Sequence, residues 1–283
     1  MIRTTSIQET KKVISQYKKK GVKIGFVPTM GALHEGHLSL IRQSQTENDV
    51  TICSIFVNPI QFDNLNDLEQ YPRMPGKDAR LLEVENCTLL FTPDEEEMLQ
   101  KYEKQEVKVD FGMLDKVLEG KYRPGHFKGV AIIVKKLLGI INPDRAYFGK
   151  KDFQQLVVIR HMVHTLGLPV QIITCETVRE SDGLALSSRN IRLTIGERKL
   201  APLIYEVLCK AKQKVGKIPV WELKEWAIKK IQENPEFRVE YFEIADKETM
   251  LPMENWERKE QAIALTAVYL GDVRLIDNIE LFS

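Results

Sequence analysis

Residues 22–57 contain two short apolar runs around a helical stretch, and this unit constrains the fold more than any other part of the sequence. VKIGFVPT at residues 22–29 ends in a proline and a glycine turn, and VTICSIFV at residues 50–57 ends in an Asn-Pro pair. We expect a helix between them, from about Leu33 to Thr46. Strands joined through a helix pair in parallel, so the unit predicts a parallel sheet with covering helices.

The same alternation continues to about residue 176. Further strands are expected at residues 87–93, 144–149 and 169–176. Further helices are expected at residues 5–19, 78–84, 130–141 and 152–167. Between them, residues 118–130 are rich in glycine and basic side chains and are interpreted as a long functional loop.

The texture of the chain changes beyond Ser181. Two helices, at about residues 195–215 and 220–232, precede strand-like runs at residues 236–246 and 261–271. We therefore predict an α/β fold with two domains. Residues 1–178 form a Rossmann-like domain with a parallel sheet, and residues 179–283 form a smaller α+β domain with a short antiparallel sheet.

Composition excludes several classes of protein. The net charge of +1 gives no bulk field that would attract nucleic acid or an acidic membrane. The longest apolar stretch, at residues 130–141, is interrupted by two lysines and is too short to span a bilayer. The four cysteines form no CxxC pair and are interpreted as reduced thiols. We expect a cytoplasmic protein without nucleic-acid or membrane partners, in which any anion site is built from local groups.

Two of the five histidines, His34 and His37, lie three residues apart where a strand is expected to pass into a helix. A helix start presents unpaired backbone N–H groups and the positive end of a dipole. Gly31 and Gly36 allow the backbone to approach a ligand closely. Both imidazoles lie on one face of the first helical turn, so the stretch predicts a phosphate site.

Two other readings of this pair stay open from the residues alone. A zinc site of the HExxH type needs histidines four residues apart, and this HEGH sequence is one residue short and lacks a third ligand nearby. The histidines are otherwise ordinary structural residues with satisfied hydrogen bonds. His161 and His164 have the same spacing inside an expected amphipathic helix, and we interpret those two as ordinary surface or core residues.

HEGH has the form H-x-G-H, which resembles the signature of the nucleotidyltransferase superfamily. The surrounding motifs narrow the resemblance, because they follow the order found in the pantoate–β-alanine ligase family. They are FVPTMGALHEGHLSLI (26–41), FVNPIQF (56–62), YPR (71–73), RPGHFKGV (123–130), PDRAYFGKKDFQQL (143–156) and RESDGLALSSRN (179–190). The motifs cover nearly the whole first domain, whereas the second domain resembles the family mostly by position.

The resemblance implies an ATP-dependent ligase that joins pantoate to β-alanine. Pantoate would attack the α-phosphorus of ATP to give pantoyl adenylate and pyrophosphate, and the β-alanine amine would then displace AMP. His34, His37 and Lys151 are the implied catalytic residues. The implied ATP-binding residues are Met30, Gly31, Ala32, Leu33, His34, Glu35, Gly36, His37, Gly149, Lys150, Lys151, Asp152, Val178, Leu186, Ser187, Ser188 and Arg189.

The resemblance also assigns Gln61, Gln155 and Asn58 to pantoate and β-alanine. Neutral amides bond a carboxylate without neutralising it, whereas an arginine would make it a poorer nucleophile. Phe56, Val130 and Leu38 either wall the pantoate methyl groups or pack in the core. Secondary candidates for the site are Tyr71, Arg123 and His126. No side chain is an obvious base for the amine step, for which His37 is the nearest titratable group.

Several further expectations follow from the resemblance. Mg²⁺ would be carried on the ATP phosphates, with Asp152 contributing through water and no direct protein ligand. The second domain would act as a lid over ATP, and the protein would be a homodimer. The family commonly has Glu or Gln at position 150, so Lys150 adds a positive charge beside Lys151. The alternative function is an adenylyl transferase that acts on a phosphorylated acceptor.

Overall fold

The computed structural model describes residues 1–99 and 109–282, which divide into two compact units. The first unit contains Met1–Phe111, Arg123–Lys150 and Gln155–Glu176. The second contains Gly112–Tyr122, Lys151–Gln154 and the chain from Thr177 onward. Two short segments that precede residue 155 thus belong to the second unit. That residues 1–178 and 179–283 form two separate domains stays a prediction.

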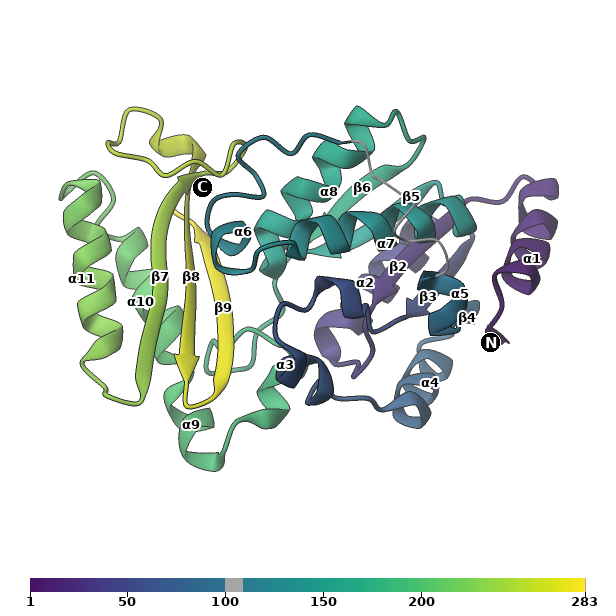
Figure 1. Ribbon diagram of the computed structural model, residues 1–283, viewed down its shortest axis with the longest axis horizontal. Coiled ribbons are helices and arrows are strands. Elements are labelled where there is room, and N and C mark those ends of the chain that lie inside the picture. Colours follow the sequence, from purple (N-terminus) through teal and green to yellow (C-terminus); the bar gives the residue numbers. More distant parts are fainter. Residues whose placement is uncertain (100–108, 283) are drawn as a thin grey trace. The chain divides into compact units, whose positions relative to one another are not determined.

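The first unit is built on a parallel sheet of six strands in the order β1-β4-β3-β2-β5-β6 (Figure 1). The strands are β1 (Ile2–Thr4), β2 (Ile24–Thr29), β3 (Val50–Ile55), β4 (Leu89–Phe91), β5 (Arg145–Gly149) and β6 (Gln171–Cys175). The main helices are α1 (Ile7–Lys19), α2 (Glu35–Glu47), α4 (Pro75–Val84), α7 (His126–Ile141) and α8 (Phe153–Thr165). Shorter helices are η1 (Pro59–Gln61), α3 (Leu65–Glu69) and α5 (Glu95–Leu99). The predicted α/β class is confirmed.

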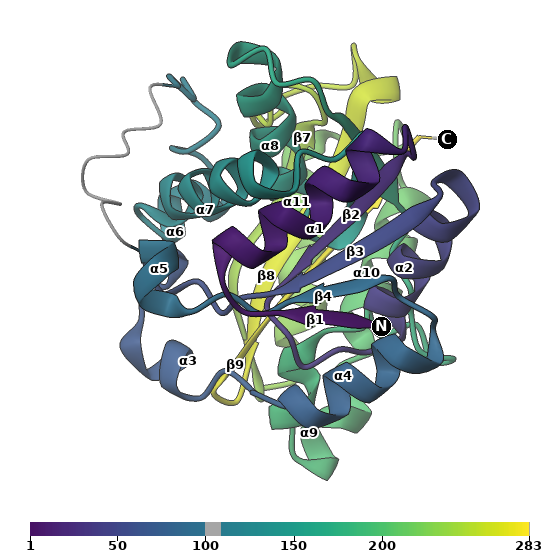
Figure 2. The same cartoon turned by 90° about the vertical axis from the view of Figure 1, so that its right-hand side faces the viewer.

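Helices cover both faces of this sheet. In Figure 2, α2 and α4 lie on one face, and α1 and α7 lie on the other. The chain proceeds from β2 through β3 to β4, then returns to add β5 on the other side of β2. Connections from β2 and β5 therefore leave toward opposite faces, which makes the carboxyl ends of these two neighbouring strands the switch point where such sheets bind ligands. Thr29 and Gly149 are the residues that end them.

Close packing of the C-terminal end of α2 on β2 depends on a glycine. Gly25 of β2 pairs with both neighbouring strands and faces α2. A Cβ atom built on Gly25 would lie 2.1 Å from Ser44 Oγ and 2.6 Å from Asn48 Nδ2, both near the end of α2. Asn48 Nδ2 in turn donates to the hydroxyl of Tyr147, a fully buried residue of β5. The missing side chain thus lets helix and sheet approach closely.

The second unit is an antiparallel sheet with helices packed against it. Strands β7 (Phe237–Asp246), β8 (Ala262–Leu270) and β9 (Val273–Glu280) pair in that order. Its helices are α6 (Glu119–Tyr122), α9 (Ile195–Leu200), α10 (Leu203–Lys212) and α11 (Val220–Gln232), with the short turns η4 (Ser188–Arg192) and η5 (Lys259–Gln261). The turn η3 (Lys150–Asp152) begins in the first unit and ends in the second. The predicted α+β class of this part is confirmed.

Three details of the predicted elements were wrong. The helix expected at residues 195–215 is two helices, because Pro202 lacks the N–H that would continue the first one. The strands β1 and β9 were not expected. Residues 118–130 are no long loop, since they contain α6 and the start of α7.

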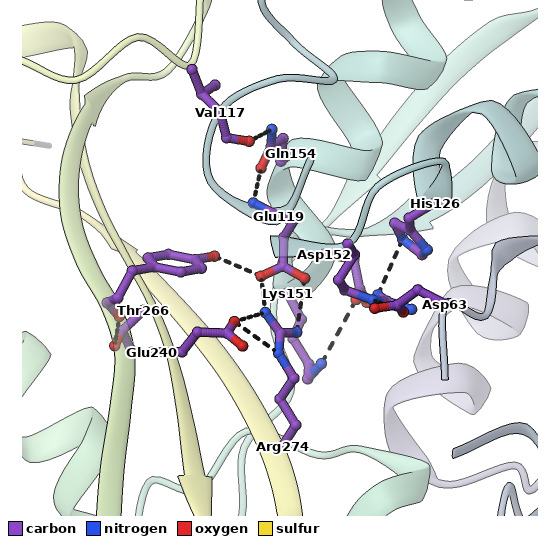
Figure 3. A network of polar contacts seen from close by, with 12 residues as sticks. Asp63, Val117, Glu119, His126, Lys151, Asp152, Gln154, Glu240, Thr266 and Arg274 are labelled. Carbon is purple, nitrogen blue, oxygen red and sulfur yellow. Dashed lines mark hydrogen bonds and ion pairs between the residues drawn. The ribbon is translucent and has the colours of Figure 1, made fainter. Parts of the chain in front are cut away.

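A buried ion-pair network explains why α6 belongs to the second unit (Figure 3). Arg274 of β9 donates to both oxygens of Glu119, at 2.9 and 2.7 Å, and to Glu240 at 2.6 Å. The Tyr241 hydroxyl donates to Glu119 at 2.7 Å, and burial together with this carboxylate raises the pKa of Tyr241. Breaking such a pair would leave a buried charge uncompensated, so Glu119 acts as an anchor of α6.

We predict that Gly25→Ala destabilises the protein, because the new methyl group overlaps Ser44 and Asn48. The expected loss is about 1–3 kcal/mol, typical of overpacking. Gly139→Ala is the matched control, since Gly139 is exposed in α7 and its added Cβ meets nothing within 4 Å. The control should gain up to about 1 kcal/mol through helix propensity. Urea unfolding followed by circular dichroism measures both, and equal midpoints for the two variants would contradict the packing argument.

Candidate active site

A tight turn leads from β2 into α2, and a buried carboxylate holds it. Gly31 and Ala32 both have positive φ angles, of 82° and 48°. The backbone N–H groups of Ala32 and Leu33 donate to the two oxygens of Asp78, at 2.9 and 2.8 Å. A Cβ on Gly31 would lie 3.1 Å from Asp78 Oδ2 and 3.0 Å from Ile55 Cγ2. Both its backbone angle and this close approach therefore favour glycine at position 31.

Asp78 is a site residue that the sequence did not reveal. It lies in α4 and is 1% exposed. Burial raises the pKa of its carboxyl group, and the hydrogen bonds from Leu33 and Ala32 oppose that rise. An aspartate in the first turn of a helix is common because it complements the helix dipole. Its position therefore gave no signal that it reaches another segment.

The hydrogen bonds at the start of α2 define the tautomers of His34 and His37. His34 is the N-cap residue, and its Nδ1 accepts from the N–H of Gly36 at 3.1 Å. The Nδ1 of His37 accepts from the N–H of His34 at 3.3 Å, which completes a capping box. Each ring thus holds its proton on Nε2, and the ring centroids are 4.1 Å apart. Each imidazole therefore carries an N–H donor at Nε2, which a role in binding phosphate would require.

Other parts of the 30–37 stretch have structural duties of their own. Ala32 and Leu33 are buried, at 2% and 3% exposed. The Glu35 carboxylate forms an ion pair with Arg42, which lies seven residues further along α2. The backbone N–H groups of Ala32 and Leu33 donate to Asp78, and those of His34 and Gly36 donate to the imidazoles. The stretch would therefore act on an anion through its imidazoles and the helix dipole.

Asn58 and Gln61 come together after β3, and they meet the 30–37 stretch. Asn58 is 2% exposed, and its Nδ2 donates to Gln61 Oε1 at 2.9 Å and to the Gly129 carbonyl at 3.1 Å. Gln61 Nε2 lies 3.1 Å from the sulfur of Met30. Asn58 and Met30 thus orient the Gln61 amide. The amide hydrogens of Asn58 are donated to Gln61 and to the Gly129 carbonyl.

The secondary candidates surround the same glutamine. Arg123 Nη2 donates to the Gln61 carbonyl at 3.2 Å, and His126 Nδ1 lies 2.8 Å from that oxygen. Arg123 also forms an ion pair with Asp63 at 3.2 Å. Tyr71 packs edge-on against Phe62. The three apolar candidates are all buried, as core residues are; they are Phe56, Val130 and Leu38.

Lys150, the residue after β5, does not add an unpaired positive charge to the first unit. Its Nζ lies 3.0 and 3.3 Å from the two carboxylate oxygens of Glu176, which follows β6. Glu176 is largely exposed, so the pair is screened by solvent. The expected surplus of charge beside Lys151 is therefore reduced by a neighbour that lies 26 residues away in sequence.

In the second unit, Lys151 and Asp152 lie in the turn before α8. Lys151 Nζ is 3.8 Å from Asp152 Oδ1, and the lysine side chain is 16% exposed (Figure 3). Two consecutive glutamines in the first turn of α8, Gln154 and Gln155, differ in environment. Gln154 is buried and bonds the backbone of Leu114, Val117 and Glu119, whereas Gln155 is half-buried in the first unit.

The remaining predicted nucleotide residues lie on one hairpin of the second unit. Arg179 and Ala185 form an antiparallel bridge, and the N–H of Leu186 donates to the Val178 carbonyl at 3.0 Å. Ser187 then caps η4, with its hydroxyl accepting from the N–H of Arg189 at 3.3 Å. Ser188 is buried at the start of that turn. The hairpin thus brings Val178 beside the Leu186–Arg189 segment.

Other expectations concern metals, membranes and the second histidine pair. Within residues 1–99 and 109–282, no group of three or more His, Cys, Asp or Glu side chains is placed to hold a metal ion. No helix in the same residues is long and apolar enough to cross a membrane. His161 bonds the Asp110 carbonyl at 2.9 Å and packs near Phe111, and His164 is exposed.

The chain is similar to known proteins along its whole length. The sequence profile of the pantoate–β-alanine ligase family matches residues 2–280. The pantothenate synthetase of Porphyromonas gingivalis is 45% identical over 276 residues, which cover 97% of each chain. That of Cytophaga hutchinsonii is 42% identical over 281 residues, which cover 99% of each.

Solved structures agree with the sequence comparison. The pantothenate synthetase of Thermus thermophilus is 40% identical, with a TM-score of 0.92 and complete coverage of both chains. The pantoate–β-alanine ligase of Francisella tularensis, solved with β,γ-ATP and β-alanine, is 36% identical, with a TM-score of 0.81 over 99% of this chain and 97% of that one. With its histidine pair at a helix start beside two ordered amides, the chain belongs to the pantoate–β-alanine ligase family.

Proposed function

We propose that this chain condenses pantoate with β-alanine in two steps at the expense of ATP, and that His34, His37 and Lys151 carry the first step. A pantoate carboxylate oxygen bonds to the α-phosphorus of ATP while the bond from that phosphorus to the bridging oxygen breaks and pyrophosphate leaves. The β-alanine nitrogen then bonds to the acyl carbon, loses a proton, and AMP departs with the carboxylate oxygen. The products are pantothenate, AMP and pyrophosphate.

The single observation that carries this proposal is the hydrogen bonding of the two imidazoles. The first step needs little acid–base help, because the pantoate carboxylate is already ionised at neutral pH. It needs two anions to be brought together and the negative charge on the leaving pyrophosphate to be stabilised. Because each Nδ1 accepts a backbone N–H, both rings offer Nε2–H donors at the positive end of α2.

Formal positive charge is proposed to come from the second unit. Lys151 would bind a phosphate as a point charge, and Ser187, Ser188 and Arg189 would hold the β- and γ-phosphates. Val178 would meet adenine through its backbone. The Ser187 hydroxyl accepts the N–H of Arg189 and still carries a hydrogen that it can donate to a phosphate oxygen. Gly149, Lys150 and Asp152 would contribute backbone and solvent-mediated contacts.

Pantoate is proposed to bind to Gln61 and Gln155. The Gln61 amide is fixed by Asn58 and Met30, which supports a binding role for it and a positioning role for Asn58. Neutral amides leave the attacking carboxylate its charge. β-Alanine would arrive mostly as the ammonium form, since such amines have a pKa of roughly 10. The neutral amine is then either selected from solution or deprotonated with help from His37.

Three further proposals concern the setting of this reaction. Mg²⁺ enters with ATP as part of the substrate, and Asp152 can reach it through water. The protein works in the cytoplasm, and as a homodimer. Sedimentation in solution tests the dimer, because a particle near the chain mass of 32.6 kDa would contradict it.

The proposal predicts that His37→Ala and Lys151→Ala each lose turnover by at least about 100-fold, because each removes a donor to the phosphates. AMP release from ATP, pantoate and β-alanine is the assay. Lys217→Ala is the matched control, since Lys217 is exposed in the second unit and lies outside the proposed site. The control should keep wild-type rates, and circular dichroism should show all three variants folded.

The same assay separates the alternatives. For the wild-type protein, AMP release should require both pantoate and β-alanine. Pyrophosphate without AMP, given a phosphorylated acceptor, would indicate an adenylyl transferase. Neither product would indicate a nucleotide-binding protein without catalysis, and unchanged rates in both histidine and lysine variants would remove the phosphate assignment.

Neighbouring glutamines provide a test of the pantoate assignment. Gln155→Ala should raise the KM for pantoate by about tenfold, as expected for one lost hydrogen bond, and leave the KM for ATP and the Tm unchanged. Gln154→Ala should lower the Tm, because it leaves backbone groups of Leu114, Val117 and Glu119 unpaired. An unchanged pantoate KM in the Gln155 variant would overturn the assignment.

A further inference from the structure

A cluster of buried polar side chains in the second unit supports the lysine proposed to bind phosphate. Asp277 and Asn278 are consecutive residues of β9, and each is 5% exposed. Asn278 Nδ2 donates to the backbone carbonyl of Lys151 at 2.8 Å. The C-terminal strand therefore contacts the main chain of a residue that lies 127 positions earlier.

Arg179 fixes the position of those two strand residues. It forms a bidentate pair with Asp277, at 2.6 and 2.8 Å, and Nη2 donates to the Asn278 carbonyl at 3.3 Å. The Asp277 carboxylate also accepts the N–H of Asn278 at 2.8 Å. Bidentate pairing fixes direction as well as distance. Asn278 is thus held from both sides while its amide points to Lys151.

The same arginine organises the hairpin that carries the other proposed nucleotide residues. Arg179 Nη1 donates to the Gly183 carbonyl at 3.1 Å, and its guanidinium lies 3.7 Å from the centre of the Tyr205 ring. Gly183 has a φ of +95°, and a Cβ there would lie 2.6 Å from Tyr205 Cδ1. The turn of the hairpin is therefore clamped by the arginine that also holds the strand.

We propose that Asn278 is a positioning residue for Lys151, and that the Arg179–Asp277 pair supports Asn278 and the 178–186 hairpin together. The inference rests on the proposed role of Lys151 in phosphate binding. A lysine side chain has four rotatable bonds, so its ammonium is placed well only if its backbone is fixed. The contact to the Lys151 carbonyl supplies that fixed point. Because one arginine serves both segments, the lysine and the Leu186–Arg189 segment have a common support.

The test replaces the donor without changing the size of the side chain. Asn278→Asp places an acceptor opposite the Lys151 carbonyl, and Asn278→Ala removes the donor without adding charge. Both should lower kcat/KM for ATP by about tenfold or more, the cost of one lost buried hydrogen bond. Asn255→Asp is the matched control, because Asn255 is exposed in the same unit. Its side-chain Oδ1 accepts the N–H of Glu257, and an aspartate oxygen at that position can accept the same hydrogen bond. That control should keep wild-type kinetics.

Two readouts separate positioning from a general structural role. On a Lys151→Ala background, Asn278→Ala should cause no further loss of rate, since it acts through the absent lysine. The loss should also be larger for ATP plus pantoate than for pantoyl adenylate plus β-alanine, because the adenylate carries less negative charge. Equal losses in both half-reactions, additive losses in the double variant, or kinetics like the control would overturn the proposal. Failure of both Asn278 variants to fold would assign the residue a structural role and overturn it as well.

The wild-type protein distinguishes this inference from the proposed function. If wild type turns over neither substrate set, the proposed function fails. If wild type turns over both and the Asn278 variants match it, only the positioning role fails.

Discussion

The turn proposed to bind phosphate depends on one buried carboxylate, Asp78, which accepts the N–H groups of Ala32 and Leu33. Those bonds stabilise a turn in which Gly31 and Ala32 have positive φ angles. The chain therefore reverses sharply after β2, and α2 begins at Glu35. That start in turn places the backbone N–H groups that occupy Nδ1 of His34 and His37. The proton on each Nε2 is thus a consequence of backbone geometry, and burial of Asp78 is the energetic cost of holding it.

Local dipoles and few cations take the place of a strong overall charge. The chain has a net charge of +1, and Lys150 of the first unit is paired with Glu176. The first unit therefore provides neutral donors: imidazole Nε2–H groups, the positive end of α2 and the amide of Gln61. The proposed cations, Lys151 and Arg189, belong to the second unit. In the proposed reaction, neutral donors near the pantoate carboxylate would preserve its nucleophilicity, whereas cations on the triphosphate would favour departure of pyrophosphate.

Periodicity predicted most of the regular elements, because buried strands and amphipathic helices have distinct patterns. The six-stranded sheet differs from expectation mainly by β1, whose three residues are too few to show a pattern. The strand β9 was missed because VRLIDNIE contains Asp277 and Asn278, which are buried only through partners that are distant in sequence. The split between α9 and α10 was visible in principle, since Pro202 marks it.

Site residues divide in the same way. A helix start with paired histidines is a local pattern, so it was predicted from the sequence. Asp78, Asn278 and Glu119 act across long sequence separations, and an acid or amide in a helix or strand gives no sign of its partner. Lys150 shows the opposite error, because a charge counted from sequence is paired in the fold. The histidine pair could therefore be predicted from the local sequence. The residues that hold the site and the fold in place could be identified only from the tertiary structure.

The central claim is that pantoate is adenylated at this helix start. Pantoate with isotopically heavy oxygen in its carboxylate tests it most directly, with ATP, β-alanine and the wild-type protein. The account predicts that AMP carries a heavy oxygen atom, because the bond from that oxygen to the α-phosphorus survives when the amine displaces AMP. AMP without the label, or the label in inorganic phosphate, would contradict it.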